Sequence, residues 1–406
     1  MRRIYLSFLG MGSHKEGKYE KTSYELDGRH SSETEFVQAA EVEILGAEKF
    51  DRFVIVVTEK SRARHFNSLD RQLRMLGAQS VTPLQIEEDM TPQGQWDWFE
   101  RMLDYIEPYD RITVDLTHGF RSVPIIFSTA INFLQKARRI TLDAVYYGVY
   151  EKDKSRSAIV NMREFYLINE WAEGVSRLVE DADARKLADL AQQAPDFQMA
   201  ELNQPELVNA FENLTNTIRN VDIHNVGHQA NEVIGLIEQK LSSASRTGRI
   251  LLNLVMEKFI SLSTDGEISG NYDRNYFQLQ LEIIRILLDH KLYMQAYTVM
   301  REFIGSIGLI AVKKAHTRTG KGRDKRKKAD LFIRMLAYDQ WQFNENDKCM
   351  MAKELLPFYR KLECRGMITG LKTCVTELTD YRNNFDHAWT SKEKAYDDIY
   401  EKGVST

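Results

Sequence analysis

Near the end of the chain, Arg382, Asn383 and His387 combine three side chains that can act on a phosphodiester. A guanidinium binds phosphate oxygens through charge-assisted hydrogen bonds. A histidine, whose ordinary pKa is about 6.5, can accept and release protons at neutral pH. An amide can orient either group through its own hydrogen bonds. These residue types could together bind a phosphate group and move a proton beside it.

The surrounding residues predict that this triplet lies on an α-helix. Arg382 falls on the apolar face of that helix, where a guanidinium needs a partner. His387 is rotated from it by about 140° about the helix axis. One helix therefore cannot easily close both groups on one phosphate, whereas two copies facing across a twofold axis, as in a homodimer, can. The apolar face comprises Leu371, Val375, Leu378, Phe385 and Trp389.

A second polar cluster follows a predicted strand. Ile112, Val114 and Leu116 alternate with polar residues, and the chain restarts at Pro124 as a helix that runs to about Ala137. Backbone N–H groups of the turn and of the helix start would favour an anion. The alternative is an ordinary turn with a glycine hinge. The candidate ligand-binding residues of the turn are Thr117, His118, Gly119, Phe120, Arg121 and Ser122.

The first predicted strand, Ile4 to Leu9, also ends in a glycine-containing turn. Ligands of α/β proteins bind at the carboxyl edge of the sheet, so this turn is a second candidate for ligand binding. No helix follows it directly, which excludes a dinucleotide fingerprint, and it is not a P-loop. We expect it to lie on the same sheet edge as the Thr117–Ser122 turn. Its residues are Gly10, Met11, Gly12 and Ser13.

The alternation of strands and helices over residues 1–165 predicts a doubly wound α/β domain with a mostly parallel sheet. A capping box at Ser32–Glu35 predicts the start of the first helix. After Phe165 the pattern is helical to the end. Breaks at Pro195, Pro205 and 242–246 divide this part into a connector, 166–245, and an all-α domain, 246–406.

Composition restricts the classes of partner. The net charge is −4, so RNA must be held by a local patch rather than by a global field. The basic stretch from Lys313 to Lys328 is interpreted mainly as a solvated, mobile loop, with binding of an RNA backbone as the alternative.

The three cysteines, Cys349, Cys364 and Cys374, predict neither a disulfide framework nor a zinc site, which fits a reducing compartment. No run approaches the roughly 20 apolar residues of a membrane span, so we expect a cytoplasmic protein without membrane contact.

Asp115-Leu116-Thr117-His118-Gly119 resembles the Asp-x-Thr-His-Gly signature of CRISPR-associated proteins from type III systems. Members of that family pair an N-terminal CARF domain with a C-terminal HEPN ribonuclease domain. The resemblance extends to Ser7–Gly12, Tyr24–Gly28 and Thr34–Ala40, and Arg382-Asn383-x-x-x-His387 is similar to the HEPN motif. Residues 293–302 also resemble a helix common in the HEPN branch.

The resemblance implies a Rossmann-like CARF domain over 1–165 that senses cyclic oligoadenylate, followed by an all-α HEPN domain. Cyclic tetra-adenylate is expected as the activator on frequency alone, with cyclic hexa-adenylate left open. The ring would bind at a twofold axis and touch the Gly10 and His118 turns of both subunits. Activation would produce metal-independent endoribonuclease activity on single-stranded RNA in antiviral defence. No metal or cofactor is expected.

The resemblance also implies the roles of the C-terminal residues. The ribose 2′-hydroxyl would attack its own phosphate and leave a 2′,3′-cyclic phosphate and a 5′-hydroxyl. His387 would move protons, Arg382 would hold the phosphate, and Asn383 would orient them.

Three alternatives remain open from the sequence. The N-terminal domain could cleave its own cyclic ligand, with His118 as a base. The chain could instead be a non-enzymatic, ligand-responsive regulator that binds DNA or a protein through its helical half. Arg219 and His224 share the spacing of Arg382 and His387, and we interpret them as a structural or interdomain pair.

Overall fold

The structure is a computed structural model, and the chain forms two compact units, Met1–Asn169 and Glu170–Thr406. The predicted boundary near residue 245 is not tested by this division and stays a prediction. The side chains of residues 123–125, 193, 319–324, 380 and 382–386 are outside the description. The described residues are 1–12, 19–87, 91–118, 123–151, 155–193, 201–263, 270–313, 315–317, 319–339, 341 and 346–386.

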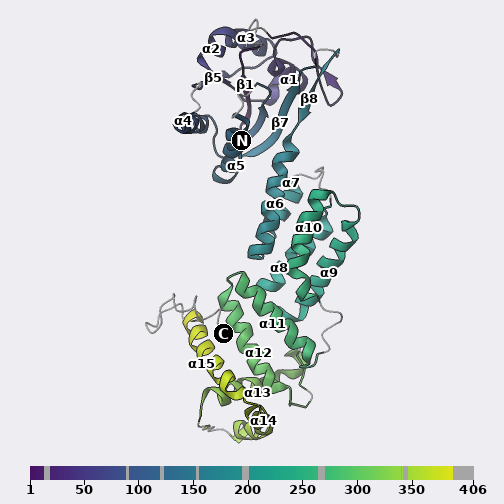
Figure 1. Ribbon diagram of the computed structural model, residues 1–406, viewed down its shortest axis with the longest axis vertical. Coiled ribbons are helices and arrows are strands. Elements are labelled where there is room, and N and C mark those ends of the chain that lie inside the picture. Colours follow the sequence, from purple (N-terminus) through teal and green to yellow (C-terminus); the bar gives the residue numbers. More distant parts are fainter. Residues whose placement is uncertain are drawn as a thin grey trace. The chain divides into compact units, whose positions relative to one another are not determined.

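The described part of the first unit is built on an eight-stranded sheet in the order β3-β2-β8-β7-β6-β1-β4-β5. Figure 1 shows this unit with helices packed around the sheet. The five strands from β7 to β5 in this order pair in parallel, whereas β8 runs antiparallel to β7. The predicted α/β unit with a mostly parallel sheet is therefore confirmed. The strands are β1 (Arg3–Leu9), β2 (Tyr24–Leu26), β3 (Arg29–His30), β4 (Arg52–Val57), β5 (Val81–Gln85), β6 (Arg111–Asp115), β7 (Thr141–Val149) and β8 (Ser157–Asn161).

Helices cover both faces of this sheet because the central strands are apolar on both sides. Tyr5 and Leu9 of β1 pack in the core beneath α1 and α3, whereas Leu6 and Phe8 pack against α4 and α5. All four strand residues are buried, as the two-residue period of a strand requires. The helical elements are α1 (Val37–Leu45), η1 (Ala47–Lys49), α2 (Glu59–Ser61), the π-helical turn η2 (Arg62–Phe66), α3 (Asn67–Met75), α4 (Pro92–Leu103) and α5 (Val123–Ala137).

The predicted capping box at Ser32–Glu35 is wrong. The first helix begins at Val37, and no side chain caps it. The backbone of Thr34 instead pairs with that of Thr22 in an isolated bridge, with N–O distances of 3.0 and 3.1 Å. The extended backbone needed for this pairing excludes Thr34 from the first turn of a helix.

The order of the strands contains a reversal at the centre of the sheet. From β1 the chain proceeds outward through β4 to β5, then returns to the other side of β1 to form β6 and continues to β7. The topological switch point therefore lies between β1 and β6. In open α/β sheets, ligands bind in the crevice outside the carboxyl ends of the strands at such a point.

The described part of the second unit is helical, as predicted. Its last helices, α12 to α15, share one apolar core that includes Tyr297, Phe332, Leu355, Val375 and Leu378. Among the described residues, none of the helices combines the length and the apolar character that crossing a membrane requires. The helices from the end of the sheet onward are α6 (Arg163–Asp181), α7 (Arg185–Gln193), α8 (Pro205–Arg219), α9 (Ile223–Leu241), α10 (Arg246–Phe259), η3 (Ile260–Leu262), α11 (Arg274–Asp289), α12 (Tyr293–Leu309), α13 (Thr319–Ala337), α14 (Asn346–Cys364) and α15 (Met367–Asp386).

The interpretation of the basic stretch as a loop is wrong from residue 319 onward. Most of its cations lie in the first half of α13. The second half of that helix carries Leu331, Phe332 and Met335, which are at most 3% exposed in the shared core. Burial of this apolar segment holds the helix in place, and the basic segment continues the same helix.

A partly buried ion pair connects the beginnings of the two central strands. Arg2, just before β1, donates from Nε and Nη2 to the Asp110 carboxylate at 3.2 and 2.7 Å. Asp110 lies just before β6 and also accepts from the Glu107 backbone N–H at 2.7 Å. Its side chain is 3% exposed, whereas the side chain of Glu107, the second partner of Arg2, is 66% exposed.

We therefore predict that Asp110→Asn lowers the free energy of unfolding by about 1–3 kcal/mol, because a buried charged hydrogen-bond partner is lost. The matched variant Glu107→Gln removes the exposed partner of the same arginine and should cost less than about 1 kcal/mol. Urea denaturation followed by circular dichroism measures both. Equal losses in the two variants would contradict this assignment.

Candidate functional site

The two predicted turns meet at the switch point. Ser7 of β1 is in register with Asp115 of β6, so the segments that follow the two strands leave the sheet side by side. A Cβ atom built on Gly10 would lie 3.4 Å from the Cβ of His118. Gly12 has a φ of 77°, which glycine tolerates at little cost. The described candidates Gly10, Met11, Gly12, Thr117 and His118 therefore share one sheet edge, as expected.

The remaining candidates of the two turns lie outside the described residues. They are Ser13, Gly119, Phe120, Arg121 and Ser122. Their assignment to a ligand site stays a prediction.

The carboxylate of Asp115 organises this edge. It is fully buried, and it accepts hydrogen bonds from Ser7 Oγ at 2.6 Å, from the Thr117 backbone N–H at 2.9 Å and from Thr117 Oγ1. Thr117 Oγ1 in turn accepts from the Gly148 N–H at 2.7 Å. A Cβ at Gly148 would lie only 2.7 Å from Val37 Cγ2, so only glycine fits there without displacement. Three elements of the sheet are thus joined through one carboxylate and one hydroxyl.

Tyr19 packs between two histidines, His65 and His118. The ring of Tyr19 lies 4.9 Å from the ring of His118 and 4.9 Å from that of His65, centroid to centroid. Nε2 of His65 lies 3.3 Å from the carbonyl oxygen of Met11. Burial lowers the pKa of His118, although the charge of Asp115 opposes this effect. The imidazole is therefore neutral at neutral pH and can accept a proton or a hydrogen bond.

A second buried carboxyl lies beneath the edge. Glu41 of α1 is fully buried, and its Oε2 accepts from the Tyr5 hydroxyl at 2.7 Å. Its Oε1 has no hydrogen-bond partner among the described residues. Burial raises the pKa of Glu41 well above its usual range, and the charge of Asp115 raises it further. Because Asp115 has the larger number of donors, Glu41 is the carboxyl that keeps a proton.

Sequence reasoning missed Tyr19, His65 and Glu41. Glu41 carried a signal, because it interrupts the apolar face of its helix between Ala40 and Ile44 and a carboxyl there is rarely buried without a role. His65 lies in the π-helical turn η2, a feature often found at functional sites, but the sequence does not mark such a turn. Tyr19 had no recognisable pattern.

The C-terminal motif lies at the end of α15. The backbone of Arg382 and Asn383 belongs to the last turns of this helix, their side chains are not described, and His387 lies outside the described residues. The helix is held just before the motif by Leu378, which is 3% exposed, and by Tyr381, whose ring stacks on Tyr297 at 5.5 Å and 16°. The predicted helix is therefore present, and the catalytic roles stay predictions.

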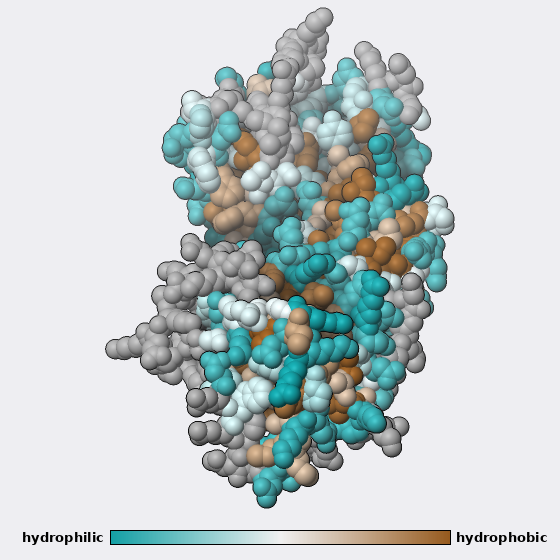
Figure 2. Space-filling view, turned by 60° about the horizontal axis from the view of Figure 1, so that its bottom comes forward, coloured by the Kyte–Doolittle hydropathy of each residue, from teal (hydrophilic) through white to brown (hydrophobic). Residues whose placement is uncertain are grey.

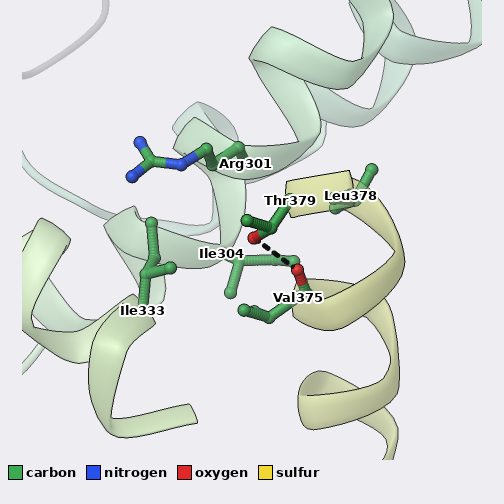
Figure 3. Close-up of a pocket in the computed structure, with 6 residues that line it drawn as sticks. All are labelled: Arg301, Ile304, Ile333, Val375, Leu378 and Thr379. Atoms are coloured by element: carbon green, nitrogen blue, oxygen red, sulfur yellow. Dashed lines mark hydrogen bonds between the residues drawn. The ribbon is translucent and has the colours of Figure 1, made fainter. Parts of the chain in front are cut away.

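A narrow pocket lies between α15 and the helices α12 and α13 (Figure 3). It is too narrow to hold a water molecule, so it is a packing contact and not a substrate site. In Figure 3 the guanidinium of Arg301 points away from Thr379, and it lies 3.3 Å from Asp330. The lining residues are Arg301, Ile304, Ile333, Val375, Leu378 and Thr379.

The second Arg–His pair has structural contacts. Arg219 donates to the carbonyl oxygens of Asp181 and Ala182 at 3.0 and 2.9 Å, where it satisfies the C-terminal end of α6. Nε2 of His224 lies 3.0 Å from the carbonyl oxygen of Thr317. Both residues are thus engaged with the backbone inside the helical unit, which agrees with the structural interpretation.

Comparison with known proteins gives one distant relative to report. No protein-family model matches the sequence. The chain is 21% identical over 270 residues to the CRISPR-associated protein MJ1674 of Methanocaldococcus jannaschii. The match covers 64% of this chain and 39% of the relative, so the chain spans about two fifths of the length of that curated protein. The chain is therefore distantly homologous to a CRISPR-associated protein.

The buried carboxyl of Glu41 predicts a pH dependence of stability. A carboxyl whose folded pKa is raised stabilises the fold fully below its ordinary pKa of 4.5, and the stabilisation is lost as the pH rises toward the folded value. Glu41→Gln keeps the acceptor for Tyr5 but binds no proton. Relative to wild type, we expect its free energy of unfolding to increase above pH 4.5 by up to about 1.4 kcal/mol per pH unit.

Urea denaturation at a series of pH values measures this difference. Glu43→Gln, at an exposed position of the same helix, is the matched control and should follow the wild-type curve. If the free energies of unfolding of Glu41→Gln and wild type change with pH in parallel, Glu41 does not carry the proton assigned to it.

Proposed function

We propose that the chain is a CRISPR-associated RNA endonuclease whose first unit binds a cyclic oligoadenylate and whose second unit cleaves single-stranded RNA. The observation that carries this proposal is the meeting of the Gly10 and His118 turns at the switch point between β1 and β6. The distant homology to a CRISPR-associated protein supports it. In this proposal the first unit is a CARF domain and the helical unit contains a HEPN domain.

The chemistry of the edge suits a nucleotide ring. A cyclic oligoadenylate presents phosphates and adenine edges together. Backbone N–H groups of tight turns favour the phosphates. A neutral His118 can donate from one ring nitrogen and accept at the other, which suits a base or a phosphate. A ring with internal symmetry fits two copies of this edge across a twofold axis, so the proposed active form is a homodimer.

The proposed cleavage needs no metal. His387 accepts the proton of the ribose 2′-hydroxyl while the 2′-oxygen attacks the adjacent phosphorus. The bond from phosphorus to the 5′-oxygen breaks, and a proton goes to that oxygen, which leaves a 2′,3′-cyclic phosphate and a 5′-hydroxyl. Arg382 binds the phosphate oxygens and stabilises the charge that develops on them. Asn383 orients the phosphate. Activation follows when the cyclic ligand binds one of two dimer states in preference to the other.

The test is cleavage of labelled single-stranded RNA in EDTA, with and without cyclic tetra-adenylate or cyclic hexa-adenylate. Wild type should cleave when one of the rings is present. Arg382→Ala and His387→Ala should each lose about 100-fold or more of the activated rate, since a general acid–base group contributes that much. His224→Ala removes a histidine at the same spacing and should keep the activity. Absence of cleavage by wild type with either ring rejects the proposal.

A second activity is favoured by one observation, the neutral His118 beside the proposed ligand crevice. A neutral imidazole held by Tyr19 and close to Asp115 could accept the proton of a ribose hydroxyl of the bound ring and so start its cleavage. Chromatography of the ring in the same reactions tests this activity. We expect wild type to open the ring and His118→Ala to leave it intact, and a ring that survives incubation with wild type excludes the activity.

A further inference from the structure

The cations of α13 whose side chains are described separate into two groups. Lys325 donates from Nζ to the carbonyl oxygen of Lys313 at 2.8 Å, Arg326 pairs with Glu302, and Lys328 pairs with Glu354. These three side chains are therefore engaged with other residues of the helical unit. Two further cations of the helix, Lys327 and Arg334, are exposed and have no ion pair or side-chain hydrogen bond with any described residue. They are available to a ligand.

Both available cations face one hollow between α13 and α14. Its volume is about 360 Å³, which lies within the roughly 300–1,000 Å³ of typical ligand sites. Lys327 and Arg334 are seven residues apart, a rise of about 10 Å along the helix, so they can contact different phosphates of one strand. The lining residues are Lys327, Asp330, Leu331, Arg334, Asp347, Lys348 and Met351.

The charges of the hollow favour an anion. Lys327 and Arg334, which have no ion pair with a described residue, face two carboxylates. One of the carboxylates, Asp330, lies 3.3 Å from Arg301 on the neighbouring helix α12. Asp347, which is exposed, is then the opposing charge that remains. This local excess of positive charge stands out in a chain whose net charge is −4. Anionic polymers respond to such local patches and not only to the net charge.

The hollow also offers apolar contact. Leu331 is buried, and Met351 is half-buried on the facing helix. In Figure 2, which brings the α13–α14 end of the helical unit forward, hydrophilic side chains cover most of the described surface, with smaller apolar areas between them. A cationic rim around an apolar floor matches a nucleotide unit, which combines a phosphate with an apolar sugar and base face.

We propose that the hollow between α13 and α14 binds the phosphodiester backbone of single-stranded RNA through Lys327 and Arg334. The inference rests on the proposed function, because it assigns to the RNA substrate a binding surface outside the Arg382–His387 motif. Asp347, which also lines the hollow, limits the affinity.

The test is binding of a labelled single-stranded RNA whose 2′-hydroxyls are all methylated, so that binding is measured without cleavage. Fluorescence anisotropy with the full chain gives the Kd over a series of salt concentrations. For Lys327→Ala combined with Arg334→Ala, we expect the Kd at low salt to rise about tenfold. The slope of log K against log salt should decrease by about 1.4, or about 0.7 for each phosphate contact. Both side chains are exposed, so thermal unfolding should be unchanged.

The matched control removes two exposed cations from α14. Lys353 and Arg360 lie about 180–200° around that helix from Met351, away from the hollow. Lys353→Ala combined with Arg360→Ala should leave the salt slope unchanged. Asp347→Asn removes the opposing charge and should lower the Kd about two- to threefold. This gain of affinity cannot result from misfolding.

Several outcomes overturn the inference. These are an unchanged Kd in the Lys327/Arg334 variant, an equal loss in the control pair, or a change of oligomeric state in size-exclusion chromatography in place of a change in RNA binding. A competition experiment gives a further such outcome. If inorganic phosphate or a mononucleotide displaces the labelled RNA as well as unlabelled RNA does, the hollow binds a small anion, and the inference is overturned. Binding that depends on Lys327 and Arg334 in a protein that cuts no RNA rejects the proposed nuclease and leaves this inference intact.

Discussion

The first unit depends on the burial of one carboxylate. Asp115 has no contact with solvent, and a buried carboxylate is costly unless donors compensate it. The compensation comes from Ser7 on the neighbouring strand and from the backbone and hydroxyl of Thr117. These hydrogen bonds determine the path of the chain as it leaves β6 and therefore the position of His118. Replacement of the carboxylate would remove the hydrogen bonds that fix the turn after β6, and His118 would lose its position with them.

The same burial determines which groups carry charge. Glu41 and Asp115 both have raised pKa values because both are removed from water. Only Asp115 has several donors, so the proton resides on Glu41. His118 is kept neutral by burial, next to a carboxylate that would otherwise favour its protonation. The described part of the edge therefore presents a neutral imidazole, which suits the hydrogen bonding that the proposed nucleotide ligand needs.

In the helical unit, the apolar core of α12–α15 positions the candidate residues. It holds α15 up to Tyr381, one residue before the predicted catalytic arginine. It also anchors the second half of α13, and the helix extends back through the basic segment. The described cations of α13 then divide according to the direction each takes from the helix: Arg326 and Lys328 pair with Glu302 and Glu354, whereas Lys327 and Arg334 face the hollow beside α14.

The sequence by itself determined the class of the first unit and the place of its candidate site. The two-residue alternation in Ile112–Leu116 and the apolar run of Phe53–Val57 identify strands, and glycine-containing turns identify strand ends. Such patterns report which face of an element is buried, and parallel strands bring their carboxyl ends to one edge. The final helix was predictable for the same reason, from the spacing of Val375 and Leu378.

Only the tertiary structure decided which residues surround those turns. Tyr19 contacts both His65 and His118, which lie about fifty and one hundred residues further along the chain, and local periodicity carries no record of such contacts. The capping box failed because Thr34 pairs with Thr22 in an isolated bridge, and the basic segment is helical because a buried apolar half holds it. In each case a long-range contact outweighed a local preference of about 1 kcal/mol.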